Sequence, residues 1–104
     1  MAEEHQHQES INFSAFVLSL ATTAAVHFGD IDDPMSGEKH DPDLKAARQM
    51  IDILALLQEK TKGNLTLEEQ RMLENSLTEL RFRFVQVADE QKQTKAAAAE
   101  VPGA

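Results

Sequence analysis

The chain has 104 residues, no cysteine and a formal net charge of −8, from 18 acidic and 10 basic residues. This length allows one domain with a small core, for which association often supplies the missing burial. The acidic balance disfavours nucleic-acid binding because it repels phosphate backbones, and the lack of cysteine excludes disulfides, thiolate metal sites and thiol nucleophiles. We expect a cytoplasmic protein, because the N-terminus is acidic and unlike a secretory signal peptide.

The first predicted helix covers residues 12–28 and follows an acidic segment, 1–10, that we expect to be disordered. No residue from Ile11 to Phe28 is formally charged, and Gly29 stands where a left-handed residue would end the helix. Its apolar residues recur at three- and four-residue spacing, which is typical of a helical face. The members of this face, which we predict to contact another chain, are Phe13, Phe16, Val17, Leu20, Ala21, Ala24 and Phe28.

The second predicted helix covers residues 42–62 and follows a loop rich in Asp, Pro and Gly. Asp41 is its expected N-cap, with Pro42 at the first helical position. Leu44, Ala47, Ile51, Leu54 and Leu57 form its main apolar stripe. Gly63 is the expected stop.

The third predicted helix covers residues 67–90. Thr66 and Glu69 form a capping-box pattern at its start. An apolar seam with alternating four- and three-residue steps follows, made of Leu73, Leu77, Leu80, Phe84 and Val87. Two further apolar residues, Phe82 and Val85, lie outside this seam. Residues 91–104 have nothing to pack, and we expect an Ala-rich disordered tail there.

These elements predict an all-α fold in residues 11–90. The short turn makes helices two and three an antiparallel αα-hairpin, on which the apolar first helix packs. A helix apolar on most sides needs more partners than one hairpin offers, so we expect oligomerisation to complete the fold.

Several segments resemble a family of short bacterial proteins catalogued as a domain of unknown function. They are FSAFVLSLATTAAVHFGDI, the Asp33-Pro34 and Gly37-Glu38 loop, DLKAARQMIDILALLQEKTKGNLT and EEQRMLENSLTELRFRFV. The resemblance covers roughly Phe13 to Val87. It implies a small bacterial α-helical protein and carries over no cofactor, partner or functional residue.

The candidate sites are few. His27 and Asp30 could act as a base and its orienting carboxylate, although a histidine at a helix C-terminus also interacts with the helix dipole. The acidic loop fails the EF-hand pattern, because Pro34 falls at a ligand position. The arginines of the third helix, Arg71, Arg81 and Arg83, could bind an anion, but Glu74 and Glu79 are near enough to pair with them. We therefore predict no metal, no cofactor and no catalytic residue.

A membrane span is disfavoured for the first helix. Polar side chains interrupt it, acidic residues flank it on both sides, and it has no Trp or Tyr at its ends. The better interpretation is a homo-oligomer in which first helices from two or more chains pack together.

Two main functional hypotheses remain. The preferred one is a non-enzymatic interaction module, a homo-oligomeric scaffold or regulator of an unknown protein partner. The alternative is a small-ligand or metal-linked enzyme with its site at His27, Asp30 and the acidic loop, and a membrane-associated protein is a further alternative. Convergence of His27 and Asp30 in a pocket with a third polar group would favour the enzyme.

Overall fold

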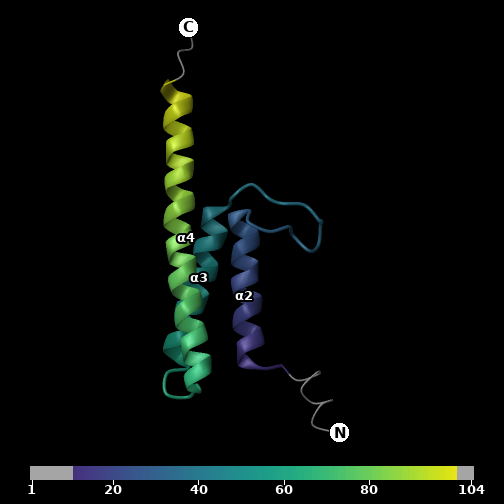
Figure 1. The fold of residues 1–104 in the computed structure, drawn as a ribbon, viewed down its shortest axis with the longest axis vertical. Helices are drawn as coiled ribbons and strands as arrows, with labels where there is room; N and C mark the ends of the chain where they lie inside the picture. The colour runs from purple at the N-terminus through teal and green to yellow at the C-terminus, as the bar shows by residue number, and fades with distance from the viewer. Residues whose placement is uncertain (1–10, 101–104) are drawn as a thin grey trace.

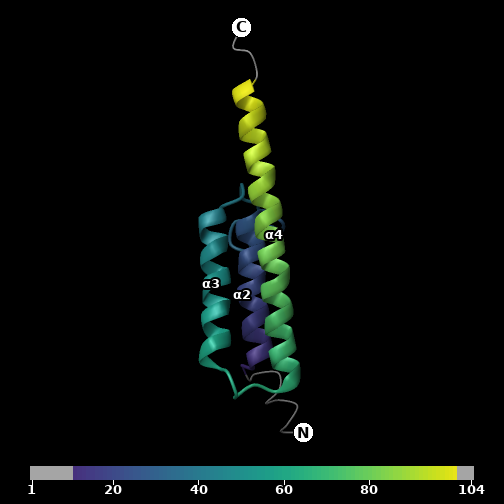
Figure 2. The same cartoon turned by 90° about the vertical axis from the view of Figure 1, so that its left-hand side faces the viewer.

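Residues 11–100 fold as a bundle of three helices. The computed structural model describes residues 11–100, with side chains to Lys95, and its helices are α2 (Phe13–Phe28), α3 (Leu44–Lys60) and α4 (Leu67–Glu100). Figures 1 and 2 show α3 and α4 as an antiparallel hairpin with α2 beside it. Residues 11–100 contain no strand. The predicted all-α fold, with the first helix packed on an αα-hairpin, is confirmed.

The core joins one face of each helix. Phe28, Leu54, Leu73 and Leu77 are the largest of its fully buried members, and each is at most 2 % exposed. The predicted stripes of α3 and α4 supply most of the remainder: Ala47, Ile51, Leu80 and Val87. Side-chain periodicity therefore identified the inward faces correctly.

The first helix also turns its predicted face into this core. Val17 and Ala24 are 0 % exposed and Phe28 is 2 % exposed, while Phe13, Leu20 and Ala21 are partly buried against the same cluster. Assigning this face to contact with another chain is therefore wrong for its buried members, because the protein's own hairpin covers them. Phe16 alone of the seven is classed as exposed.

Local capping explains where α2 begins and ends. The Asn12 side chain accepts a hydrogen bond from the Ala15 N–H at 2.8 Å. Gly29 has a φ of 81°, and a Cβ there would lie 2.7 Å from the His40 carbonyl oxygen. Only glycine fits both the left-handed backbone and this close crossing of the following loop.

The second helix begins two residues later than predicted. Its N-cap is Asp43, whose side chain accepts from the Ala46 N–H at 3.1 Å, rather than Asp41. The Asp43 N–H donates to the His27 carbonyl at the end of α2, at 2.7 Å. This tertiary bond holds Asp43 outside helical geometry, so Pro42 stays in the loop. The capping box of α4 is confirmed, since Thr66 and Glu69 exchange hydrogen bonds of 2.8 and 3.1 Å.

The expected disordered C-terminal tail is instead largely helical. In Figures 1 and 2, α4 continues past the ends of α2 and α3 as far as Glu100. The reason is intrinsic propensity: Ala, Lys, Gln and Glu are strong helix formers and prolong a helix that packing has already nucleated. The predicted tail at residues 1–10 and the last four residues, 101–104, lie outside the described part of the chain.

Candidate interaction surfaces

The loop from Asp30 to Asp43 is folded around one carboxylate. Asp33 accepts a hydrogen bond from the Met35 N–H at 2.8 Å and lies 2.6 Å from His40 Nε2. These two partners, the backbone N–H first, lower the pKa of Asp33 from its ordinary 3.8, because they favour the charged form. Backbone bonds between Asp33 and Gly37 (2.7 Å) and between Asp33 and Glu38 (2.9 Å) close the turn.

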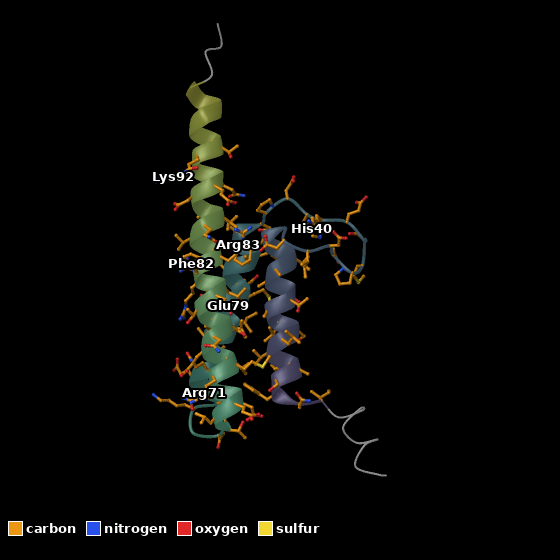
Figure 3. The ribbon with its side chains drawn as sticks, viewed as in Figure 1. His40, Arg71, Glu79, Phe82, Arg83 and Lys92 are labelled. Carbon is orange, nitrogen blue, oxygen red and sulfur yellow. The ribbon has the colours of Figure 1, made fainter. Side chains whose placement is uncertain are left out.

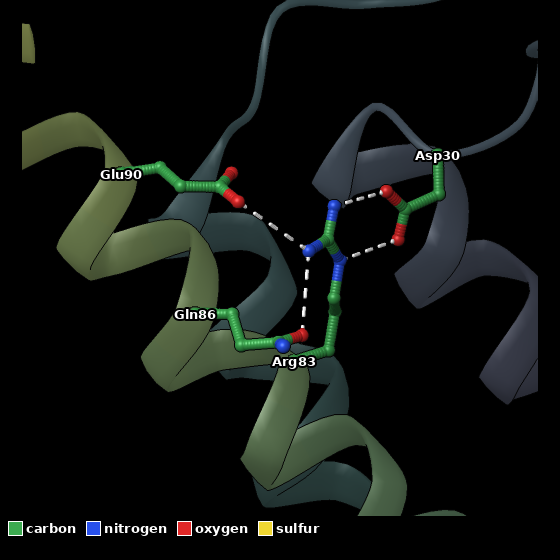
Figure 4. A network of polar contacts seen from close by, with 4 residues as sticks. All are labelled: Asp30, Arg83, Gln86 and Glu90. Carbon is green, nitrogen blue, oxygen red and sulfur yellow. Dashed lines mark hydrogen bonds and ion pairs between the residues drawn. The ribbon is translucent and has the colours of Figure 1, made fainter.

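A bidentate ion pair ties α4 to the end of α2. Arg83 donates to both carboxylate oxygens of Asp30, at 2.6 and 3.0 Å, across 53 residues of sequence (Figure 4). Gln86 and Glu90 lie on the other side of the guanidinium, at 3.4 and 3.9 Å. The hydrogen bond to Asp30 raises the pKa of Arg83 above its ordinary value. Arg83 thus joins two helices rather than pairing with Glu74 or Glu79.

The His27–Asp30 site proposed for an enzyme is not assembled. Arg83 binds both oxygens of the Asp30 carboxylate, and within the described residues this carboxylate accepts no hydrogen bond from the His27 ring. Neither residue lines any of the three main grooves of the described chain. Within residues 11–100 no group of three or more His, Asp or Glu side chains is arranged to hold a metal ion. Among the described residues the structure thus shows neither a hydrogen bond between His27 and Asp30 nor a groove lined by them.

The outer face of α2 is uncharged. We define it as the exposed residues of that helix: Ala15, Phe16, Leu18, Ser19, Thr22 and Thr23. Leu18 is 57 % exposed and Phe16 is 43 % exposed. The Ser19 hydroxyl donates to the Phe16 carbonyl at 2.8 Å, and the Thr23 hydroxyl donates to the Ser19 carbonyl at 2.9 Å. Two of the three hydroxyl groups on this face are thus satisfied by the helix itself.

A second exposed apolar surface lies on α4. Phe82 is 64 % exposed and Val85 is 57 % exposed, and we call this pair, with Arg48 and Arg81 on the Val85 side, the arginine-flanked patch. The Arg48 guanidinium stands 5.7 Å from the centre of the Phe84 ring and 3.6 Å from Asp52. A shallow groove of about 310 Å³ between α3 and α4 adjoins the patch at Val85, whereas Phe82 lies outside it; the groove is lined by Arg48, Ile51, Asp52, Arg81, Phe84 and Val85.

Some features of these surfaces can be predicted from the sequence and others cannot. Phe82 and Val85 were visible as apolar residues off the α4 seam, which is the signal of an exposed apolar pair. The pairing of Arg83 with Asp30 had no local signal, because the partners are far apart in the sequence. The uncharged character of α2 was visible, but its separation into a buried and an outer face depended on where the hairpin lies.

Comparison with known proteins places the chain in a family. In the described residues, none of the helices is both long enough and apolar enough to cross a membrane. No curated protein and no solved structure gives a match. The model of one family, described as "Domain of unknown function (DUF1844)", matches residues 10–86. That match extends from the start of α2 into the packed part of α4 and covers most of the sequence. The chain therefore belongs to the DUF1844 family, a domain of unknown function.

Proposed function

We propose that the protein is a non-enzymatic association module that pairs with a second copy through the outer face of α2. The single observation that carries this proposal is the absence of charge from that exposed face, in a chain whose net charge is −8. Solvent-exposed helix faces ordinarily carry charged side chains, as α3 does with Lys45, Arg48 and Asp52. A face that lacks them is suited to burial.

Electrostatics supports this choice of surface. Two copies that each carry a net −8 repel one another at most orientations. Approach through the outer face of α2 brings no like charges into direct contact, because that face holds none. Ion pairs and their desolvation cost are also absent from such a contact, so its strength would come from apolar burial.

Two of the three hydroxyl groups of this face are already satisfied in a way that suits a dry contact. Ser19 and Thr23 already donate their hydroxyl hydrogens to helix carbonyls, so covering them leaves no unpaired donor. Ala15 and Ser19 are small, which lets a second helix approach closely. Leu18 and Phe16 supply the larger apolar area, and complete burial of such a side chain contributes about 1.5–3 kcal/mol.

The test compares two leucines of similar exposure. Leu18 on α2 is 57 % exposed and Leu56 on α3 is 54 % exposed. We expect Leu18→Asp to weaken self-association about tenfold or more, because it places an unpaired charge in the contact. Leu56→Asp should leave it nearly unchanged. Sedimentation equilibrium over a range of concentrations measures both, and circular dichroism confirms that each variant is folded.

Two results would contradict the proposal. One is a wild-type protein that stays monomeric at all concentrations tested. The other is an equal effect of the two substitutions, which would mean that added charge, rather than its position on α2, controls association.

The role in the cell that follows is scaffolding or regulation of a partner protein, with the pair as the working unit. Such a module acts through its helical surfaces and needs no catalytic group. The cysteine-free sequence suits a reducing cytoplasm.

A further inference from the structure

The tip of the α2–α3 loop displays apolar and acidic side chains together. Met35 is 94 % exposed and Ile31 is 39 % exposed. The loop from Asp30 to Asp43 has six acidic residues and one lysine, a net charge of −5. In the described structure Asp30 and Asp33 are paired with Arg83 and His40, whereas the carboxylates of Asp32, Glu38 and Asp41 make no hydrogen bond or ion pair.

This loop presents Met35 in a fixed turn. The Asp33 carboxylate accepts a hydrogen bond from the Met35 N–H and lies against the His40 ring. The Asp33 backbone N–H donates to the Glu38 carbonyl, and the Asp33 carbonyl accepts from the Gly37 N–H. A binding segment that is already ordered loses less conformational entropy on association than a flexible one. The ordered turn therefore exposes the Met35 side chain for contact with another surface. Its flexible thioether adapts to shallow apolar sites.

The arginine-flanked patch of α4 has the complementary chemistry. Phe82 and Val85 offer an exposed apolar surface, and Arg48 and Arg81 line the groove on the Val85 side of it. Arg48 is held over the Phe84 ring and lies 3.6 Å from Asp52, an exposed i,i+4 pair that contributes little by itself. Arg81 has no ion pair or side-chain hydrogen bond within the described residues. Both guanidinium groups are therefore open to a carboxylate from outside the chain.

The loop and the patch lie on opposite sides of the molecule. Figure 3 shows His40 in the loop beyond α2, Arg83 directed toward α2, and Phe82 on the other side of α4. Helix geometry agrees, because Phe82 is two residues, or about 200° of rotation, from buried Leu80. The two surfaces cannot meet within one chain. They can meet between two chains, and such a contact is head-to-tail, since each copy keeps one loop and one patch unoccupied.

We infer that the acidic loop of one copy docks on the arginine-flanked patch of a second copy. Met35 packs on Phe82 and Val85, while the carboxylates of Asp32, Glu38 and Asp41 face Arg48 and Arg81. This contact goes beyond the proposed function, because it uses surfaces that leave the outer face of α2 open. Used together, the two contacts extend pairs of chains into longer assemblies.

Two properties distinguish this contact from pairing through α2. It depends on opposite charges at an exposed rim, so it weakens as ionic strength rises. It also buries a small area, which is typical of weak and transient association. Pairing through the uncharged face of α2 has no such salt dependence.

The test uses two variants that each remove one half of the contact, both made in the Leu18→Asp background to suppress pairing through α2. Met35→Ser removes the apolar side chain of the loop, and Phe82→Ser removes the aromatic ring on which it packs. Both side chains are mostly exposed, so folding should be preserved. Leu67→Ser, at a leucine that is 61 % exposed, is the matched control. Sedimentation velocity at low and high salt measures association of each protein alone and of the two variants mixed.

The expected result is that each half-contact variant alone associates about tenfold more weakly than the Leu67→Ser control. Their mixture should recover a 1:1 complex at low salt, because the intact loop of one variant meets the intact patch of the other. Failure of the mixture to associate above its separate components would overturn the inference. So would a monomeric Leu18→Asp parent at every concentration. If Leu18→Asp itself associates as strongly as the wild type, the proposal of pairing through α2 fails. The mixture experiment still decides whether the loop docks on the patch.

Discussion

The two faces of α2 are both uncharged, but one is buried and the other is exposed. The inner face, with Val17 and Ala24, is 0 % exposed and belongs to the core. The outer face, with Leu18 and Thr22, is exposed and equally free of charge. In α3 the comparison differs, because Ala47 and Leu54 face the core while charged residues cover much of the outside. The bundle needs only one apolar face from each helix, so the uncharged outer face of α2 is not explained by folding of the single chain.

The two faces of α2 should respond very differently to an added charge. Ala24→Asp should unfold the protein, because an unpaired carboxylate in the core costs several kcal/mol, comparable to the whole stability of a small domain. Thr22→Asp, two residues earlier on the exposed side, should keep its fold and lose self-association. Thermal unfolding followed by circular dichroism separates the two. A stable, cooperative Ala24→Asp variant would show that the core is placed incorrectly.

The ion pair between α2 and α4 should have a moderate effect. Arg83→Ala and Asp30→Ala each remove one side of a bidentate pair that is about one-third exposed. We expect a coupling free energy of about 1 kcal/mol in a double-mutant cycle, because solvent screens such pairs. Chemical denaturation of the four proteins measures it. A coupling near zero would mean that the pair does not contribute to holding α4 against the end of α2.

Removal of residues 91–104 should change helicity more than stability. Among the described residues, this part of the helix makes one side-chain hydrogen bond to the bundle, from Gln91 to the Pro42 carbonyl at 3.3 Å. We therefore expect the far-ultraviolet signal at 222 nm to fall, in proportion to the lost helical residues, while the melting temperature shifts by roughly 2 °C or less. A large fall in melting temperature would indicate docking of the C-terminal part of α4.

Of these changes, replacing the Asp33 carboxylate in the loop should alter stability least. The folded pKa of Asp33 lies below 3.8, so its contribution to stability is present above that pH and is lost as the pH falls through the folded value. Asp33→Asn should therefore be less stable than the wild type at neutral pH, and the difference should shrink below pH 3.8. Melting temperatures at a series of pH values measure this. A difference that grows in acid would reverse the assigned sign.

Sequence patterns predicted this fold where local physics controls it. The capping box at Thr66, the stop at Gly29 and the stripes of α3 and α4 each depend on residues a few positions apart. The start of α3 was missed because a bond between Asp43 and His27 overrides the local preference of Pro42. The end of α4 was missed because packing was taken as necessary for a helix, whereas propensity alone extends it to Glu100.

The candidate surfaces were less predictable. The seven-residue face of the first helix was correctly identified as a helical face, but its buried members serve the protein's own core. Which side of α2 remains open depends on the position of two other helices, and no spacing within α2 records that. Local spacing suggested His27 as the partner of Asp30, whereas the structure pairs Asp30 with the distant Arg83.

The most direct test of the central claim, that α2 pairs through its outer face, uses the absence of cysteine from the chain. Thr22→Cys places one thiol on that face, and Thr78→Cys places one on an exposed position of α4 as the control. A short thiol-to-thiol crosslinker is applied at low protein concentration, and covalent dimers are quantified on a denaturing gel. We predict that Thr22→Cys gives covalent dimers in high yield and Thr78→Cys gives few. Equal yields, or none from Thr22→Cys at concentrations where the protein associates, would contradict pairing through α2.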